Sequence, residues 1–497
     1  MKLFKNGVFH TMETESSRKY QMATENGIII GFDDEIKGLI FDEEIDLKGY
    51  HVYPGFVDAH LHLLGYGQKL SRPNLYHIKS KTAVLLSILD SFNSEPYFAE
   101  GYVEQGITAK DLDRISTEFP IYLRHNDYHS ITVNHVVLRL AGIKNSNGVL
   151  TEKEAERALA TFPKYTNEKL CELLQKAISS LYTYGITGGH SDDLYYFNGF
   201  KNTVSVFEET LKDLPFRAHL LMHHQVLDDY VKSNRPWMDQ SKYLQLGAIK
   251  MFYDGTLSSK TALMKAPYAN SKSNGLKIQS DIEFIKMIQK VRSYQLPLAI
   301  HVIGDLGLDQ VIDILKKYPP KKGLHDRLIH TPYMDLETID EMKKIPVSLD
   351  IQPQFLSSDL PWALDFMSKA PELIFPWKSL LHNGFNLAGS SDAPVEIPNP
   401  LLGIYAATER RSNMDSQIYV KNEQLSRFEA VSLYTKYANY STMKENRGFL
   451  KKGFVADLSI FESDILTMSS FSLLSSKCMM TFIDEKIVYR SELEVTK

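Results

Sequence analysis

Short apolar runs alternate with helix-patterned segments through the middle of the chain, and this alternation restricts the fold more than any other feature. Eight runs have the pattern of strands. Most are followed by apolar residues at three- and four-residue spacing, as in "DQVIDILKKY" at 309–318. The runs are 54–62, 120–127, 185–192, 247–255, 296–305, 327–335, 347–355 and 385–394. Eight β/α units predict an α/β TIM barrel, with its active site at the carboxyl ends of the strands.

The two ends of the chain show a different pattern, that of short strands joined by tight turns. Asn-Gly pairs at 6–7 and 26–27 lie between apolar residues, which indicates hairpins, and strand patterns return at 453–462 and 478–490. Neither end can bury a sheet face alone. We therefore expect one small β-domain, a β-sandwich, built from residues 1–53 and 441–497, around a barrel at 54–440. The stretch 68–120 is too long for a plain β/α unit and predicts a subdomain inserted over the barrel mouth.

The charge and cysteine content exclude several classes of protein. The net charge of −5 is not concentrated in blocks, so we expect no nucleic-acid or anionic-lipid partner. We find no signal peptide and no apolar stretch long enough to cross a bilayer. Cys171 and Cys478 are too few for a disulfide framework and fit a reducing cytosol. The sequence predicts a cytoplasmic protein that acts on a small molecule and leaves open whether it forms a homo-oligomer.

Polar residues occupy equivalent positions at the ends of several predicted strands. They are His60 and His62 on the first strand, Lys250 on the fourth, His301 on the fifth, His330 on the sixth and Asp392 on the eighth. Side chains two apart on a strand share a face, so both histidines of the first strand project into the barrel mouth. A single buried histidine is more often a hydrogen-bonded core residue. The repeated placement instead favours a site for one or two divalent ions, most consistent with zinc.

Lys250 lies inside the apolar run "AIKMF", where loss of solvation favours the neutral amine. One interpretation is a buried ion pair, for example with Asp254. The other is that the amine takes up carbon dioxide and becomes a carbamate, an anionic bidentate ligand that could bridge two cations. We favour the carbamate.

Other polar residues near the predicted strand ends are candidates for contact with substrate. His190 and His129 could bind a substrate carbonyl or another polar group, and Arg124 could orient an acidic group. Structural roles are equally open for all three. Asp58 lies on the same strand face as His60 but one layer deeper, so we expect it to support a metal ligand rather than to be one.

These residues lie in motifs that resemble the amidohydrolase superfamily and, within it, the YtcJ-like group that includes N-substituted formamide deformylases. The motifs are "PGFVDAHLHLLG" (54–65), "DYHSITVN" (127–134), "IKMFYDGTLSSKTALMKAPY" (249–268), "AIHVIGD" (299–305), "LIHTPYM" (328–334), "GSSDAPVEIPNPLLGIYAATER" (389–410) and "KGFVADLSIF" (452–461). The resemblance covers essentially the whole chain.

The resemblance implies a distorted TIM barrel beside a composite β-sandwich. It also implies a metal site whose ligands are His60, His62, His301, His330, carboxylated Lys250 and Asp392, with Asp392 also the general base. Two positions differ from the group. Tyr128 replaces a usual glycine, and Lys260, a candidate substrate contact, replaces a usual arginine. The substrate of the group is therefore not carried over.

The predicted residues favour hydrolysis. A bound metal lowers the pKa of its water towards about 7, and Asp392 could take the proton and deliver it to a leaving amine. We therefore expect cleavage of an amide or N-formyl carbon–nitrogen bond other than a peptide bond. Lactone or ester hydrolysis remains open, because the same hydroxide attacks either carbonyl. Deamination is disfavoured, because Asp305 rather than a glutamate closely follows His301 and a deaminase needs no Lys250. A non-catalytic chain is least favoured, because all six ligand positions are filled.

Overall fold

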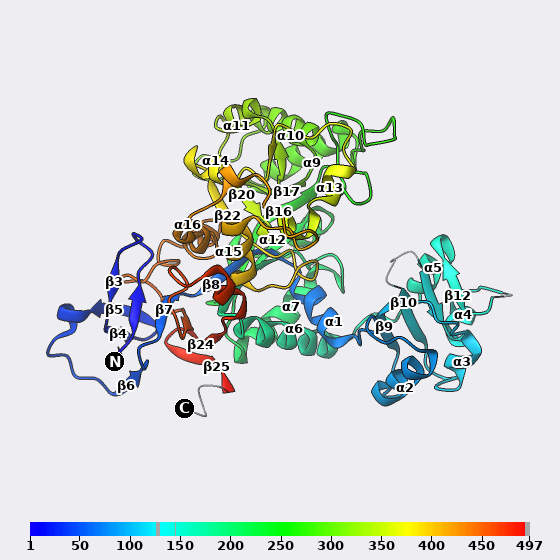
Figure 1. Cartoon of the computed structure of the whole chain (residues 1–497), viewed down its shortest axis with the longest axis horizontal. Coiled ribbons are helices and arrows are strands. Elements are labelled where there is room, and N and C mark those ends of the chain that lie inside the picture. Colours follow the sequence, from blue (N-terminus) through cyan, green and yellow to red (C-terminus); the bar gives the residue numbers. More distant parts are fainter. Residues whose placement is uncertain (126–129, 145, 493–497) are drawn as a thin grey trace. The chain divides into compact units, whose positions relative to one another are not determined.

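The computed structural model describes residues 1–125, 130–144 and 146–492. Its chain divides into two compact units (Figure 1). The larger unit consists of Met1–Tyr66 together with Leu174–Lys497, and the smaller unit of Gly67–Leu173.

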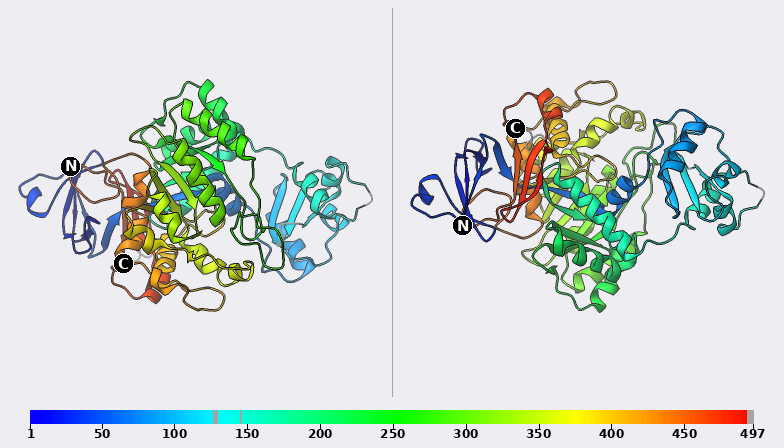
Figure 2. Two further views of the ribbon diagram at one scale, coloured as in Figure 1. Left: turned by 90° about the horizontal axis from the view of Figure 1, so that it is seen from above. Right: turned by 90° about the horizontal axis from the view of Figure 1, so that it is seen from below.

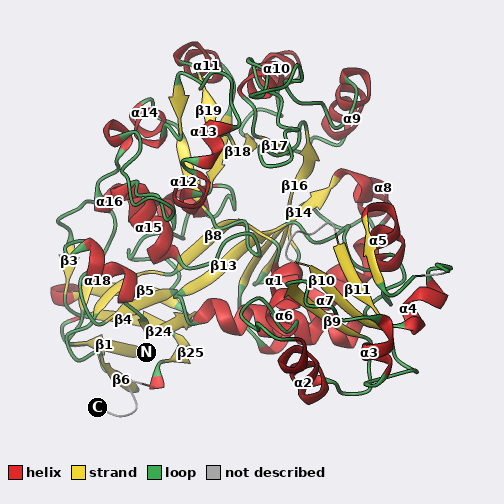
Figure 3. Cartoon of the chain, turned by 45° about the vertical axis from the view of Figure 1, so that its right-hand side comes forward, coloured by secondary structure: helices red, strands yellow, loops and turns green. Residues whose placement is uncertain are grey.

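A parallel sheet of eight strands forms the centre of the larger unit (Figure 3). In chain order, which is also their spatial order, the strands are β8 (Phe56–Leu61), β13 (Ile186–Ser191), β14 (Arg217–His223), β16 (Leu244–Phe252), β17 (Leu298–Val302), β18 (Asp326–His330), β20 (Val347–Ile351) and β22 (Asn386–Gly389). A short strand, β15 (Met238–Asp239), pairs with β16. Almost all residues of the eight strands are buried, as expected for a parallel sheet that is covered on both faces.

The sheet is nearly closed into the predicted barrel. Its first and last strands approach each other through backbone hydrogen bonds just beyond β22, rather than through a strand ladder. The Asp392 N–H donates to the His60 carbonyl at 2.8 Å, and the His62 N–H donates to the Ala393 carbonyl at 2.7 Å. These two bonds bring the polar end of the first strand against the polar end of the last.

Helices follow most barrel strands and pack around the sheet (Figure 3). The helix patterns at 309–318 and 336–345 form α10 (Asp305–Lys317) and α11 (Leu336–Met342). In α9 (Asp281–Ser293), Ser280 caps the first turn, and the buried side chains of Phe284, Ile288 and Val291 follow helical spacing. The other helices with residues in this unit are α1 (Leu63–Ser71), α6 (Asn167–Tyr182), α7 (Gly199–Asp213), α8 (Leu227–Lys232), α12 (Pro353–Asp359), α13 (Trp362–Asp365), α14 (Trp377–His382), α15 (Pro400–Glu409), α16 (Arg427–Leu433), α17 (Lys436–Tyr440) and α18 (Ser470–Ser475).

Both ends of the chain contribute to one β-domain, as the sequence predicted (Figure 2). One sheet has the order β25 (Lys486–Arg490), β24 (Cys478–Ile483), β23 (Leu458–Phe461), β7 (His51–Pro54), β2 (Val8–His10) and β3 (Arg18–Lys19). The other has the order β5 (Ile28–Phe32), β4 (Met22–Glu25), β1 (Lys2–Lys5) and β6 (Glu43–Asp46). Phe4 and Met22 from the N-terminal end share a buried core with Leu458 and Phe482 from the C-terminal end.

The smaller unit has a sheet of its own. Its strands lie in the order β12 (Val149–Thr151), β11 (Ser130–Val133), β10 (Ile121–His125) and β9 (Tyr97–Tyr102), and its helices are α2 (Lys81–Ser91), α3 (Ala109–Asp113), α4 (His135–Leu140) and α5 (Glu152–Leu159). None of the helices in the described part of the chain has the length and apolar character needed to cross a membrane.

The assignment of residues 120–127 to the second barrel strand was wrong. Residues 121–125 form β10, which pairs with β9 and β11 in the smaller unit. The barrel strand that the prediction omitted is β14, within "FRAHLLMH" at 216–223, which pairs with β13 and β16 and is the third strand of the barrel. An apolar run specifies a buried strand but not its neighbours, so the pattern alone could not distinguish the two sheets.

Candidate metal centre

The carboxyl ends of the barrel strands bring the six predicted ligand residues into one cluster. They are His60 and His62 at the end of β8, Lys250 on β16, His301 on β17, His330 at the end of β18, and Asp392 just beyond β22.

Within this cluster the side chains at the end of the first strand lie close to the carboxylate that follows the last strand. Asp392 Oδ1 lies 3.5 Å from His60 Nε2 and 3.6 Å from His62 Nε2. One ligand atom from each of these three residues lies within 4.8 Å of the others, a spacing that could hold a metal ion. Lys250 Nζ is 3.2 Å from His60 Nε2, and the ring centroid of His330 is 4.5 Å from that of His301 and 5.8 Å from that of His60.

Hydrogen bonds to oxygen acceptors determine which nitrogen is unprotonated in three of the four histidines. His62 Nδ1 donates to the Asp192 carbonyl at 2.9 Å, and His330 Nδ1 donates to Gln352 Oε1 at 2.7 Å. Both rings therefore keep a lone pair on Nε2. His301 Nε2 donates to the Gly255 carbonyl at 3.1 Å, which leaves the lone pair on Nδ1, and His60 Nε2 lies 3.2 Å from Lys250 Nζ. Each imidazole thus has one nitrogen in the form that binds metals.

Burial favours the uncharged form of every ionisable group in the cluster. It lowers the pKa of His62 to about 4 and that of His301 to about 3, and the positive charge of Lys250 acts in the same direction. The pKa values of His60 and His330 are also well below the usual value, mainly because of burial. Burial raises the pKa of Asp392 to about 7, although Lys250 opposes this shift. The four imidazoles are therefore neutral at pH 7, as metal ligation requires.

The amine of Lys250 is enclosed, with 1% of the residue exposed. Burial lowers its pKa, while Asp192 and Asp392 oppose the shift. Its nearest carboxylate is that of Asp192, with Oδ2 at 3.9 Å. Asp254, the partner considered from sequence, instead accepts backbone hydrogen bonds from Leu263, Ile303 and Gly304.

Asp58 connects the first strand to the segment after the last strand. Its Oδ1 accepts from the His60 N–H at 3.2 Å, and its Oδ2 accepts from the Ser391 hydroxyl at 2.6 Å. It therefore holds the backbone beside two candidate ligands, His60 and Asp392, which is the geometry expected of a supporting residue.

Two candidate substrate contacts of the larger unit, His190 and Lys260, are not among the residues that line the site. His190, assigned to the third strand, lies on the second strand, β13, where it is buried and accepts from Arg327 at 3.0 Å. Lys260 is exposed, with Nζ 5.0 Å from the centroid of the Phe366 ring. Arg124 lies on β10 of the smaller unit and not on a barrel strand. His129 lies outside the described residues.

A cavity of about 320 Å³ opens beside the cluster and is lined by His60, His62, Lys250, His301, His330 and Asp392. Aromatic side chains form much of the remaining wall, among them Phe252, Phe355, Trp362, Phe375 and Trp377. The sequence pattern did not indicate these residues. Phe252 ends β16, and the other four lie in short helices or in a loop whose course the pattern does not predict.

Two polar residues of the site were also missed. Gln352, which bonds to His330, directly follows β20, and Asp192 directly follows β13. Both lie at strand ends, so the rule that located the histidines also applied to them. Glutamine and a lone aspartate are common in loops, however, and this makes the signal weak.

Comparison with known proteins places the chain among hydrolases. The amidohydrolase family model matches residues 43–489. The chain belongs to this family. A curated relative of this amidohydrolase is the putative amidohydrolase YtcJ of Bacillus subtilis, which is 34% identical over 98% of this chain and 99% of its own length. The N-substituted formamide deformylase of Arthrobacter pascens is 22% identical over 97% of each chain.

The fold of this amidohydrolase resembles that of solved enzymes. An uncharacterised metal-dependent hydrolase from Pyrococcus horikoshii superposes with a TM-score of 0.83 at 24% identity, covering 95% of this chain and 99% of the other. Family membership identifies the chain as an amidohydrolase-family hydrolase, and the superposition shows that the two proteins share a fold.

Proposed function

We propose that this amidohydrolase cleaves the carbon–nitrogen bond of a small amide or N-formyl compound other than a peptide. The observation that carries the proposal is the convergence of His60, His62 and Asp392 at the carboxyl edge of the barrel, with ligand atoms within 4.8 Å of one another. Lys250, His301 and His330 lie beside them in the same cavity.

The residues fit a divalent metal, and we propose zinc. Neutral imidazoles and a carboxylate are ligands that zinc accepts, and catalytic zinc sites keep one position open for water or substrate. His60, His62 and Asp392 would hold one ion. His301 and His330 would hold a second, with Lys250 bridging as a carbamate. A bound ion supplies a nucleophile at neutral pH, because it lowers the pKa of water to about 7.

The protein's own groups would direct the bond changes. Asp392 takes a proton from the attacking water, whose oxygen bonds to the acyl carbon. The carbon–nitrogen bond then breaks, and Asp392 returns the proton to the departing amine nitrogen. The aromatic wall of Phe355, Trp362 and Trp377 holds an apolar substituent and excludes bulk water from the reacting carbonyl.

A substrate screen tests this proposal. The purified full chain is stripped with a chelator, reloaded with zinc, and assayed against N-formyl amines, N-acyl amines and lactones. We expect amide turnover that is lost on stripping, restored by zinc, and absent from a His60→Ala/His62→Ala variant. If the chain cleaved lactones but neither N-formyl amines nor N-acyl amines, the amide assignment would be overturned and an esterase favoured. Turnover that survives both stripping and the double substitution would overturn the metal centre.

We predict that Gln352→Leu weakens zinc binding by about 10–100-fold, because His330 loses the acceptor that orients its ring. Competition with a chelating dye measures the affinity. Gln354→Leu is a matched control, since Gln354 is also buried and donates to the Ile397 carbonyl at 2.8 Å without contacting a histidine of the site. Equal losses of affinity in both variants would show that general destabilisation, not ring orientation, is responsible.

A further inference from the structure

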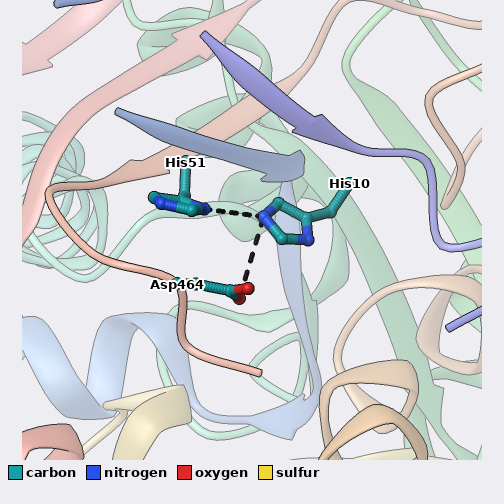
Figure 4. Close-up of side chains that lie close together, drawn as sticks. All are labelled: His10, His51 and Asp464. Atoms are coloured by element: carbon teal, nitrogen blue, oxygen red, sulfur yellow. Dashed lines mark hydrogen bonds and ion pairs between the residues drawn. The ribbon is translucent and has the colours of Figure 1, made fainter. Parts of the chain in front are cut away.

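We propose that the β-domain formed by the two chain ends carries a second metal site, made by His10, His51 and Asp464, that takes a borderline divalent transition metal such as Zn²⁺ (Figure 4). His10 ends β2, His51 begins β7, and Asp464 lies in the loop after β23. This site is separate from the barrel cluster and does not depend on the hydrolase proposal.

The three potential ligand atoms have the spacing that a small cation requires. His10 Nε2 lies 2.9 Å from His51 Nδ1 and 3.7 Å from Asp464 Oδ1, and all three atoms lie within 4.8 Å of one another. Ligand atoms about 2.0–2.1 Å from a tetrahedral zinc ion are about 3.3 Å apart. The two measured separations lie on either side of that value, so small side-chain adjustments would complete the geometry. Figure 4 shows the three side chains converging on one space.

The surrounding residues hold two of the three groups in place. The His10 ring is completely buried and stacks on Tyr53, with ring centroids 4.3 Å apart and planes 12° apart. The Tyr53 hydroxyl donates to Asp464 Oδ1 at 2.6 Å, and the Leu466 N–H donates to the same oxygen at 2.9 Å. Hydrogen bonds of this kind orient a ligating carboxylate. His51 is only partly buried, which leaves a route for an ion to enter.

Hydrogen bonds among the side chains of His10, His51 and Asp464 cannot satisfy all of their polar atoms. Both polar neighbours of His10, His51 Nδ1 and Asp464 Oδ1, face the same nitrogen, and one N–H can be donated to only one of them. A cation between the three groups interacts with both ring lone pairs and with the carboxylate at once. Arg18 is the nearest charged side chain of opposite sign to the carboxylate, but it approaches the other oxygen, Oδ2, at 4.0 Å.

A metal here would join segments that are distant in sequence. Its ligands come from both chain ends, so it would bind the folded β-domain and not the unfolded chain. Such binding stabilises the folded state. We therefore expect a structural ion, separate from any ion in the barrel.

The test counts ions in a chain whose barrel site has been weakened. The full-length His60→Ala/His62→Ala variant is dialysed against Zn²⁺ and then against metal-free buffer, and retained zinc is measured by mass spectrometry. We expect one more equivalent of zinc in this chain than in the same chain carrying His51→Gln or Asp464→Asn. Zinc should also raise the Tm of the first chain and leave the Tm of the other two unchanged.

His382→Gln in the same background is the control, because His382 is an exposed histidine of the same unit. It should retain the extra equivalent. His51→Gln and Asp464→Asn are assayed separately, so that misfolding of one variant, seen by circular dichroism, leaves the other informative. Equal zinc content with and without His51→Gln or Asp464→Asn would overturn the site. So would the absence of a zinc-dependent rise in the Tm of the His60→Ala/His62→Ala chain. The readouts are metal content and Tm, so failure here is distinguishable from failure of the hydrolase proposal.

Discussion

Replacing Asp392 by asparagine is expected to lower kcat for amide hydrolysis by about 10²–10⁴-fold, the usual contribution of a positioned acid–base group. Asparagine has nearly the same shape, but its amide cannot take a proton from water or return one to the leaving amine. The assay is run at saturating zinc, because the substitution also removes a carboxylate ligand. Metal content is measured on the same samples to separate loss of the base from loss of the ion.

Asparagine is the appropriate replacement because of the backbone at this position. Asp392 has φ 55°, in the left-handed region that asparagine tolerates better than most residues, and its N–H bond to the His60 carbonyl remains possible. Asp313→Asn, at an exposed aspartate on α10, controls for loss of one carboxylate and should leave kcat unchanged. If zinc-loaded Asp392→Asn kept kcat within a factor of about three, a different group would have to be the base.

The candidate ligands could be found from sequence because barrel topology turns strand position into spatial proximity. His60, His301 and His330 are far apart in the chain, yet each lies at the carboxyl end of a strand, and those ends meet at one edge of a closed sheet. The order of neighbouring strands does not affect this proximity. The six candidate ligand residues therefore lie together although residues 121–125 form β10 of the smaller unit and no barrel strand.

Inferences that depended on the environment of one residue were less successful. Arg124 was tied to the wrong strand and therefore to the wrong sheet. His190 lies on a barrel strand, but its ring contacts His219 and Arg327, and Arg327 also binds Asp350 and the Ala59 carbonyl. The hydrogen-bond partner of a buried polar group depends on side chains from several strands at once. The pattern of a single sequence does not show which of these side chains lie together. The same limit applies to the cavity wall, because most of its aromatic residues lie in short helices and a loop after the strands.

Replacement of Lys250 by alanine is expected to reduce bound zinc from two ions per chain to at most one. It should also lower kcat/KM by about 10²–10³-fold, because the active site loses a group that stabilises developing charge where bulk water is excluded. The amine is buried among the candidate ligands, 3.2 Å from His60 Nε2, a position from which its carbamate could bridge two cations. Carbamate formation joins the amine nitrogen to the carbon of CO₂ and releases one proton to solvent. The bridging role therefore requires both Lys250 and dissolved carbon dioxide.

That requirement supplies an independent measurement. Zinc reloading of the stripped wild-type chain should restore activity fully with bicarbonate and poorly in CO₂-depleted buffer, and ¹³C-bicarbonate should give a carbamate carbon signal that Lys250→Ala lacks. Lys343→Ala, at an exposed lysine, should behave like the wild type in every assay. Two tightly held ions in Lys250→Ala would contradict the bridging role. A wild-type chain with one ion, no carbamate signal and no bicarbonate dependence would instead favour Lys250 as the buried ion-pair partner of Asp192, whose Oδ2 lies 3.9 Å away. The barrel would then act with a single metal, and hydrolysis would rest on His60, His62 and Asp392.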